Sequence, residues 1–157
     1  MKKTYRNIFF AILAIIVLIQ IIPVDRSNPQ SEAEIIATSD VKTILENSCY
    51  DCHSNQTNWP WYSYIAPVSW LVSKDVHDGR KHLNFSNWEN LSTEKKADKL
   101  DEIWEYVSKG EMPMPIYTFM HPSAKLSNEQ KTVLKNWTSG EMSNLPPKAH
   151  NHEEHED

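Results

Sequence analysis

The stretch Cys49-Tyr50-Asp51-Cys52-His53 says the most about how this chain folds and what it holds. It has the C-x-x-C-H pattern of covalent haem attachment. On a helical turn the two sulfurs, three residues apart, face the same side, so each can form a thioether with one haem vinyl group. His53 is then held beneath the iron as a proximal ligand. We therefore expect one covalently attached haem c.

Three other interpretations of these cysteines remain open. A thiol redox pair also uses C-x-x-C, but it expects a preceding strand in a βαβ unit, and no such pattern precedes Cys49. A disulfide across so short a loop is rare, and it would not account for the histidine that follows at position 53. A zinc site could be built from two thiolates and two imidazoles, those of Cys49, Cys52, His77 and His82. The gap between Cys52 and His77 is longer than in compact zinc fingers.

A candidate for the second axial iron ligand follows about sixty residues later, in Gly110-Glu111-Met112-Pro113-Met114-Pro115. Methionine sulfur suits iron, and His/Met ligation raises the reduction potential of a cytochrome. The two prolines restrict the backbone around both methionines, so Met112 and Met114 are presented by a stiff loop after a helix end. The alternative is that both methionines only fill gaps in a core.

The first 24 residues have the layout of a signal sequence or a membrane anchor. An apolar run, residues 8–22, is interrupted only by Gln20. The basic residues in front of it are Lys2, Lys3 and Arg6. No Ala-x-Ala cleavage site follows, so we expect an uncleaved signal anchor over residues 1–24, with the basic end in the cytoplasm and the rest exported. A buried core helix is disfavoured, because such helices are not usually apolar all round behind a charged flank.

The composition limits the remaining possibilities. A chain of 157 residues has room for one ordinary domain plus accessory segments. Hydrophobic residues make up 39% and charged residues 24%, as in a globular protein, and two cysteines are too few for a disulfide scaffold. The net charge is −5, and the acidic excess lies outside the basic N-terminus. Nucleic acid is therefore an unlikely partner.

Apolar spacing predicts four helices and no strand, and hence an all-α fold. They follow a polar linker at residues 25–34 and are expected near residues 39–48, 67–79, 97–110 and 127–140. Ser39 or Asp40 is expected to be the first N-cap, and Ser127 with Gln130 forms a capping box. The three glycines of the chain, Gly79, Gly110 and Gly140, are each expected to end a helix. We expect the globular domain at residues 35–141 and a disordered acidic, His-rich tail at 142–157.

Two side-chain groups in the expected domain have more than one interpretation. An aromatic cluster follows the cysteines and is expected to line a cofactor pocket or to be ordinary core: Trp59, Trp61, Tyr62, Tyr64 and Trp70. The cationic run at residues 80–82 could contact haem propionates. His77, His82 and His121 are expected to be surface or hydrogen-bonding residues rather than ligands. The tail histidines, residues 150, 152 and 155, are expected to be solvated, although weak metal binding is an alternative.

At this point the sequence resembles a class I c-type cytochrome and, more narrowly, the small bacterial family described as haem-binding domain. The matching blocks are CYDCHSNQTNWPWYSYIAPVSWLV from Cys49, HDGRKHLNFSNW through Trp88, GEMPMP from Gly110, and HPSAKLS at residues 121–127. The resemblance covers about residues 35–140. It implies a small class I cytochrome c-like helical domain, with long loops around one covalent haem.

The resemblance also implies a role for each matching site residue. Cys49 and Cys52 would form the thioethers, His53 would be the proximal iron ligand and Met112 the distal one. Many cytochromes carry Met-Pro-Pro, whereas here Met114 separates the two prolines and is a rival for the iron.

Two saturating ligands leave the iron no open position for a substrate, so the remaining chemistry is one-electron transfer. We expect a membrane-anchored, periplasm-facing monohaem c-type cytochrome in a bacterial inner membrane. It would serve a respiratory redox partner as an electron carrier rather than as an enzyme. The alternative is a haem peroxidase or small-ligand sensor, which requires a displaceable distal ligand. A zinc-binding module is the third possibility.

Overall fold

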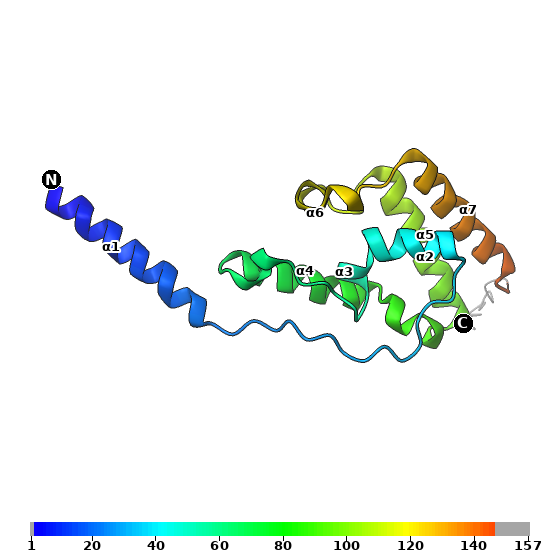
Figure 1. Ribbon diagram of the computed structural model, residues 1–157. Coiled ribbons are helices and arrows are strands. Elements are labelled where there is room, and N and C mark those ends of the chain that lie inside the picture. Colours follow the sequence, from blue (N-terminus) through cyan, green and yellow to red (C-terminus); the bar gives the residue numbers. More distant parts are fainter. Residues whose placement is uncertain (1, 147–157) are drawn as a thin grey trace, which may run out of the picture. The chain divides into compact units, whose positions relative to one another are not determined.

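The computed structural model describes residues 2–146, and every regular element in that range is a helix (Figure 1). The predicted all-α class is therefore confirmed. The longer helices are α1 (Lys2–Leu18), α2 (Ser39–Ser48), α4 (Val68–His82), α5 (Thr93–Lys109) and α7 (Asn128–Asn144). The shorter elements are α3 (Tyr50–His53), α6 (Pro115–Met120) and the 3-10 helices η1 (Ile19–Ile21), η2 (Trp61–Tyr64), η3 (Phe85–Asn90) and η4 (Pro122–Ala124).

The N-terminal helix is apolar on all sides from Ile8 onward. Residues 3–21 form the one helical segment in the described range that is long and apolar enough to cross a membrane. This segment has 19 residues and a mean hydropathy of 1.9, and none of it is buried in the protein. A helix satisfies its own backbone hydrogen bonds, as a segment in lipid must. The finding is compatible with either a membrane anchor or a signal sequence.

The chain divides into two compact units. Among the described residues, the first unit comprises 2–32 and 50–86, and the second comprises 33–49 and 87–146. The predicted domain at residues 35–141 contributes to both units. The division falls between Cys49 and Tyr50, inside the C-x-x-C-H motif.

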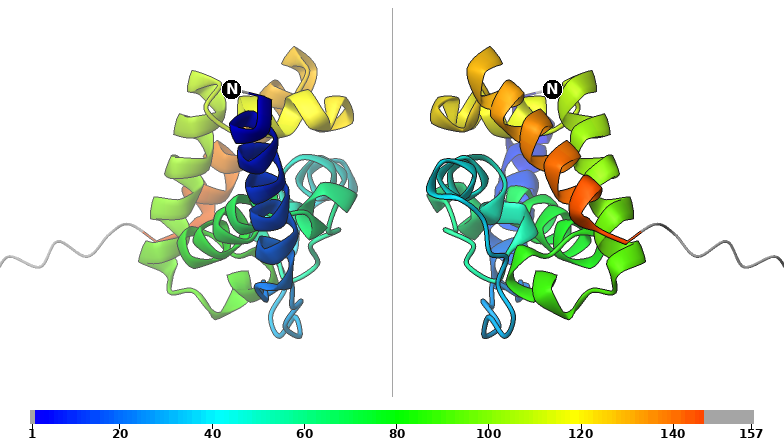
Figure 2. Two further views of the ribbon diagram at one scale, coloured as in Figure 1. Left: turned by 90° about the vertical axis from the view of Figure 1, so that its left-hand side faces the viewer. Right: turned by 90° about the vertical axis from the view of Figure 1, so that its right-hand side faces the viewer.

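The second unit is built on an ordinary apolar core. Helix α5 packs along α7, as Figure 2 shows, and α2 contacts α7 and η4. The buried side chains come from every one of these elements: Val41, Ile44, Leu45, Leu100, Val107, Ala124 and Leu134. The capping box opens α7 as predicted, with Gln130 N donating to Ser127 Oγ at 3.2 Å and Ser127 N donating to Gln130 Oε1 at 2.8 Å.

The first unit has a much smaller apolar core. Helix α4 packs against α3 and η2. Within residues 2–32 and 50–86, the buried apolar side chains are Tyr50, Ala66, Val76 and Phe85. Small polar side chains fill most of the other buried positions of this unit: Ser54, Asn55, Thr57, Ser63, Ser69, Ser73 and Ser86. A unit with so little buried apolar surface gains little hydrophobic stabilisation from its own side chains.

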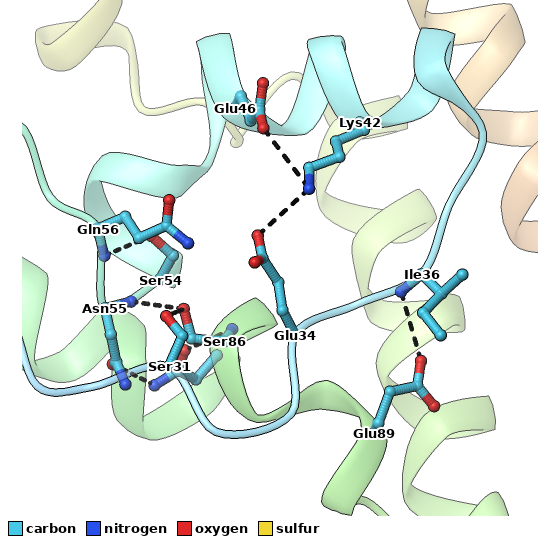
Figure 3. Close-up of polar contacts among 11 residues, drawn as sticks. Ser31, Glu34, Ile36, Lys42, Glu46, Ser54, Asn55, Gln56, Ser86 and Glu89 are labelled. Carbon is cyan, nitrogen blue, oxygen red and sulfur yellow. Dashed lines mark hydrogen bonds and ion pairs between the residues drawn. The ribbon is translucent and has the colours of Figure 1, made fainter.

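The predicted linker at residues 25–34 has no helix or strand, but the part in the first unit is hydrogen-bonded to the rest of that unit. Ser31 Oγ donates to Ser86 Oγ at 3.1 Å, and Asn55 N donates to the same oxygen at 2.9 Å (Figure 3). Ser73 Oγ donates to Asp25 O at 2.9 Å. These bonds hold the segment that connects α1 to the second unit against the loop after α3 and against α4.

Several predicted helix ends were wrong. Of the three glycines, only Gly110 ends a helix, with φ at +74° after the last residue of α5. Gly79 and Gly140 lie inside α4 and α7. Helix α7 continues to Asn144, so the start of the predicted tail is helical, and residues 147–157 lie outside the described range. Thr38 rather than Ser39 or Asp40 is the N-cap of α2.

Candidate functional site

The C-x-x-C-H motif begins at the last residue of the second unit's α2 segment, Cys49, and continues through α3 of the first unit. Cys49 is the C-cap of α2, and its N–H donates to Leu45 O at 2.8 Å. Cys52 and His53 lie on α3, a single helical turn, as the sequence predicts. Both cysteines are half-buried, and they are not disulfide-bonded to each other. The disulfide interpretation therefore gains no support.

The His53 imidazole is held by two backbone carbonyls. Its Nδ1 lies 3.0 Å from Gly79 O at the end of α4 and 3.1 Å from Leu83 O just beyond it. Both neighbours are acceptors, so Nδ1 must carry the proton and Nε2 must carry the lone pair. In the described part of the chain Nε2 has no hydrogen-bond partner. This is the tautomer that a ligand histidine needs, with its other nitrogen held by backbone carbonyls.

Helix α4 approaches α3 so closely that only glycine fits at the contact. A Cβ on Gly79 would lie 2.5 Å from Cys52 O and 3.2 Å from Cys52 Cβ. Real Cβ atoms do not come so near to a backbone oxygen. A residue with a side chain would not fit at position 79. The close packing of α4 on α3 also brings the carbonyl of Gly79 within hydrogen-bond distance of His53.

Phe85 supports α3 from within the same unit. Its fully buried ring stacks on Tyr50 with centroids 5.6 Å apart and meets the His53 ring edge-on at 6.5 Å. The hydrogen bonds to Nδ1 and this aromatic contact together fix the orientation of the imidazole plane. Phe85 lies in one of the sequence blocks quoted above, but no spacing signal marks it as part of the site.

Arg80 is hydrogen-bonded to the segments that surround the site. All three guanidinium nitrogens donate hydrogen bonds within the first unit. The acceptors are Ser54 O at 2.7 Å, Ser27 O at 2.9 Å, Asn28 Oδ1 at 2.7 Å and Thr57 Oγ1 at 2.7 Å. Four of the five guanidinium N–H groups are therefore used by the loop after α3 and by the predicted linker. The contact of residues 80–82 with haem propionates stays a prediction.

Burial is the largest cause of the pKa shifts of Cys52 and His53 on α3. It raises the pKa of the Cys52 thiol to about 11, with smaller contributions from Asp51 and Asp75. Burial also holds the pKa of His53 below its ordinary value, although the carbonyls of Leu83 and Gly79 oppose that shift. Near neutral pH the thiol is thus protonated and the imidazole is neutral. A redox-active thiol pair needs a lowered pKa, so that interpretation of Cys52 loses support.

The two methionines belong to the second unit. Glu111 N and Met112 N both donate to Tyr106 O, at 3.0 and 3.2 Å, so the backbone is fixed from the end of α5 to Met112. Met114 is extended, with φ −52° and ψ 135°, and is the N-cap of α6. Both methionine side chains are half-buried. The stiff proline-flanked turn is as the sequence predicts, but the short helix that begins at Pro115 was missed.

The histidines proposed for zinc do not form a metal site. Among residues 2–146 no group of three or more His, Cys, Asp or Glu side chains could hold a metal ion. His77 instead faces Asp25, with its Nε2 3.4 Å from Asp25 Oδ2. His121 stacks on Tyr117 with ring centroids 4.6 Å apart, as a hydrogen-bonding or packing residue would. The tail histidines lie outside the described residues.

The aromatic cluster after the cysteines is not core. Trp59 and Tyr62 are half-buried, whereas Trp61, Tyr64 and Trp70 are exposed. Trp59 also has a buried indole N–H without a hydrogen-bond partner. The same is true of the indole N–H of Trp137, which lies in the second unit. An unpaired buried donor costs free energy, and a carboxylate or another acceptor beside it would remove that cost.

Helix α4 leaves an apolar face open on the side of the cysteine motif. Val68 and Val72 share a face with Gly79, since residues four and seven apart on a helix align. Gly79 touches Cys52, but α3 is one turn long and covers only that end of the face. Val68 is exposed, Val72 is half-buried, and neighbouring Leu71 is exposed. The residues present in the first unit thus fit a haem: a ligand nitrogen, the Cys52 thiol and an apolar surface, in a unit with little core of its own. The second thiol, that of Cys49, directly precedes this unit in the chain.

Comparisons with known proteins agree with this chemistry. A sequence model of the family described as "Haem-binding domain" matches residues 14–140. A curated relative, cytochrome c peroxidase Ccp of Escherichia coli (strain K12), is 28% identical over 124 residues. That match covers 72% of this chain but 26% of the relative, so the chain spans about a quarter of the relative's length. No solved structure matches the chain.

Proposed function

The chain belongs to the haem-binding domain family, and we propose that it is a membrane-anchored, monohaem c-type cytochrome that carries single electrons. The observation that carries this proposal is the state of His53. Two backbone carbonyls accept hydrogen bonds from its Nδ1–H, which leaves Nε2 available one residue after a cysteine thiol. When bound, the haem supplies an iron that exchanges one electron between its ferric and ferrous states.

In this proposal Cys49 and Cys52 attach the haem. Each thiol would hold the haem by a thioether to one vinyl group, an addition in which the thiol hydrogen would go to the other vinyl carbon and no net oxidation would be needed. His53 is the proximal iron ligand. The raised pKa of Cys52 supports a thiol that stays protonated and unreactive until the haem is delivered to it.

Met112 is proposed as the distal ligand, because its backbone is fixed by the capped end of α5 and its thioether is soft. Met114 remains a rival, because its backbone is also fixed: its carbonyl accepts a hydrogen bond from Thr118 N at 3.0 Å. If His53 and Met112 both hold the iron, no open position would remain for a substrate, and the chemistry that the haem would supply is one-electron transfer. Acidic residues outside the N-terminal segment would suit a basic docking patch on a respiratory partner.

Residues 3–21 are proposed to anchor the protein in the bacterial inner membrane, with the rest of the chain in the periplasm. The support is the exposed apolar helix and the three basic residues at its N-terminal end. Expression together with a cytochrome-maturation system tests the proposal. We expect haem-stained protein in the membrane fraction after a high-salt wash, and a far-red sulfur-to-iron band in the oxidised spectrum.

A peroxidase is the second candidate, and the similarity to the E. coli peroxidase favours it. That similarity spans about a quarter of the relative, so the relative's activity need not reside in the matching part. The two functions differ in how readily an external molecule replaces the distal ligand of the iron. An electron carrier with a bound Met112 should bind carbon monoxide slowly and turn over little hydrogen peroxide. Rapid carbon monoxide binding by the unmodified protein, together with peroxide turnover, would favour the peroxidase.

A further inference from the structure

Gln20, the only polar residue in the apolar run, connects the N-terminal part of the first unit to the turn before α4 in the same unit. Its Nε2 donates to Ala66 O at 3.1 Å, and Ala66 N donates to its Oε1 at 3.0 Å. Gln20 Nε2 also donates to Ile16 O at 2.9 Å, within its own helix. A side-chain amide that pairs with both backbone groups of Ala66 fixes the end of the apolar segment to the turn before α4.

The position of Gln20 along the apolar segment sets its depth in a bilayer. Nineteen residues at a helical rise of about 1.5 Å span about 28 Å, close to the thickness of a hydrocarbon core of about 30 Å. Gln20 is one residue from the end of this segment, so it would lie at the boundary between acyl chains and headgroups. Ala66, hydrogen-bonded to it, must lie within a few ångströms of the same boundary.

The residues next to Ala66 are the kind that membrane interfaces favour. Trp61 is 71% exposed, Tyr64 59% and Ile65 47%. We call residues 61–65 the interfacial turn. No Asp, Glu, Lys or Arg occurs from residue 53 to residue 73, so no formal charge opposes contact with lipid. Trp and Tyr concentrate at the headgroup level of membranes because their rings are apolar at one end and polar at the other.

Arg26 reinforces the arrangement from the predicted linker. Its Nη1 donates to Ser63 O at 3.1 Å, and its guanidinium lies 4.5 Å from the centroid of the Tyr64 ring. The interfacial turn and the residue after it are therefore hydrogen-bonded at two places to the chain that leaves the membrane. Gln20 binds Ala66, and Arg26 binds Ser63. A cation at this depth is also placed to meet lipid phosphates.

We propose that the interfacial turn inserts into the headgroup layer of the bilayer that holds α1, so that the unit carrying His53 is fixed at one depth and tilt rather than swinging on a tether. This inference rests on the anchoring in the proposed function. The site lies at the other end of α4 from the interfacial turn: Val68 and Gly79 are eleven residues apart, about 17 Å along the helix axis.

Site-directed spin labelling of the full-length, haem-loaded protein in phosphatidylethanolamine–phosphatidylglycerol vesicles tests the proposal. Single cysteines are introduced as Ile65→Cys in the turn, Ile15→Cys in the apolar segment and Lys81→Cys on the exposed end of α4. Accessibility to oxygen relative to a water-soluble nickel complex reports the depth of each label. We expect the deepest value at residue 15, a purely aqueous value at residue 81, and at residue 65 a ratio several-fold above that at 81.

The Gln20→Leu variant keeps the segment apolar but removes both bonds to Ala66. In this background the label at residue 65 should move toward the aqueous value while the label at residue 15 stays deep. An aqueous value at residue 65 in the otherwise unmodified protein, with residue 15 deep, overturns the proposal and leaves the anchor intact; the exposed aromatics would then face a protein partner. Aqueous values at both positions overturn the anchor and this inference together.

Discussion

Gly79 packs directly on the backbone of Cys52: a single added carbon at Gly79 would lie 2.5 Å from the Cys52 carbonyl oxygen. The carbonyl oxygen of Gly79 accepts a hydrogen bond from His53 Nδ1, with the two atoms 3.0 Å apart. One residue thus sets both the spacing between α3 and α4 and the orientation of the proposed iron ligand.

The Gly79→Ala substitution should therefore disturb the site itself. The added methyl group must push α4 from α3, which costs about 1–3 kcal/mol in the free energy of unfolding and loosens the hydrogen bond to His53. Gly140→Ala is the matched control, because Gly140 also lies inside a helix and a Cβ there meets no atom within 4 Å. That change should stabilise the protein by up to about 1 kcal/mol. Chemical denaturation and the haem spectrum of both variants check this, and equal effects would contradict it.

The Cys52 thiol should be slow to react in protein made without haem. A pKa of about 11 leaves about 0.3% thiolate at pH 8.5, against about half for an ordinary cysteine. In a Cys49→Ser background, alkylation of Cys52 by iodoacetamide at pH 8.5 should be about 100-fold slower in the folded protein than in guanidinium. The folded rate should rise about tenfold per pH unit until pH 11, since only the thiolate reacts. Equal folded and unfolded rates would refute the burial of this thiol.

Replacing Arg80 should destabilise the first unit. Arg80→Met removes four hydrogen bonds that join α4 to the loop after α3 and to the predicted linker. We expect a loss of about 2–4 kcal/mol in the free energy of unfolding, because several acceptors lose a charged donor. Lys81→Met, an exposed neighbour, should change it by less than about 0.5 kcal/mol. Similar midpoints for the two variants in urea unfolding would show that Arg80 has no such role.

The two methionines can be distinguished by their effects on the iron. Met112→Ala should abolish the far-red sulfur-to-iron band of the oxidised protein, lower its reduction potential and speed carbon monoxide binding, because a soft ligand is lost. Met114→Ala should keep the band, with at most a small shift in potential. If Met114→Ala removes the band and Met112→Ala does not, the distal ligand is assigned to the wrong residue.

The sequence was sufficient for the helical class, for the helical turn at Cys52 and His53, and for the capping box at Ser127, because each depends on local spacing. It could not distinguish a glycine that ends a helix from one that lets two helices touch. Gly110 and Gly79 look alike in sequence, and only the positive φ of the first and the close contact of the second separate them.

Long-range hydrogen bonds account for the rest of what was missed. Residues 25–31 read as a polar linker, but Arg80 and Ser73 bind backbone carbonyls within them. The apolar spacing of α4 predicted a helix but not its buried face, which is made by Ser69, Ser73 and Val76 while Val68 and Leu71 stay exposed. Serines bury well when their hydroxyls have partners, and no local pattern shows which partners they will find.

The central claim is that a haem is covalently bound through Cys49 and Cys52 beside His53. Intact mass of the protein under denaturing conditions, after expression with the maturation machinery, tests it most directly. The account predicts a mass equal to the polypeptide plus one haem, and only the polypeptide mass when both cysteines are replaced by serine. Unmodified protein that carries no added mass, from a host that matures another c-type cytochrome in the same cells, would contradict it.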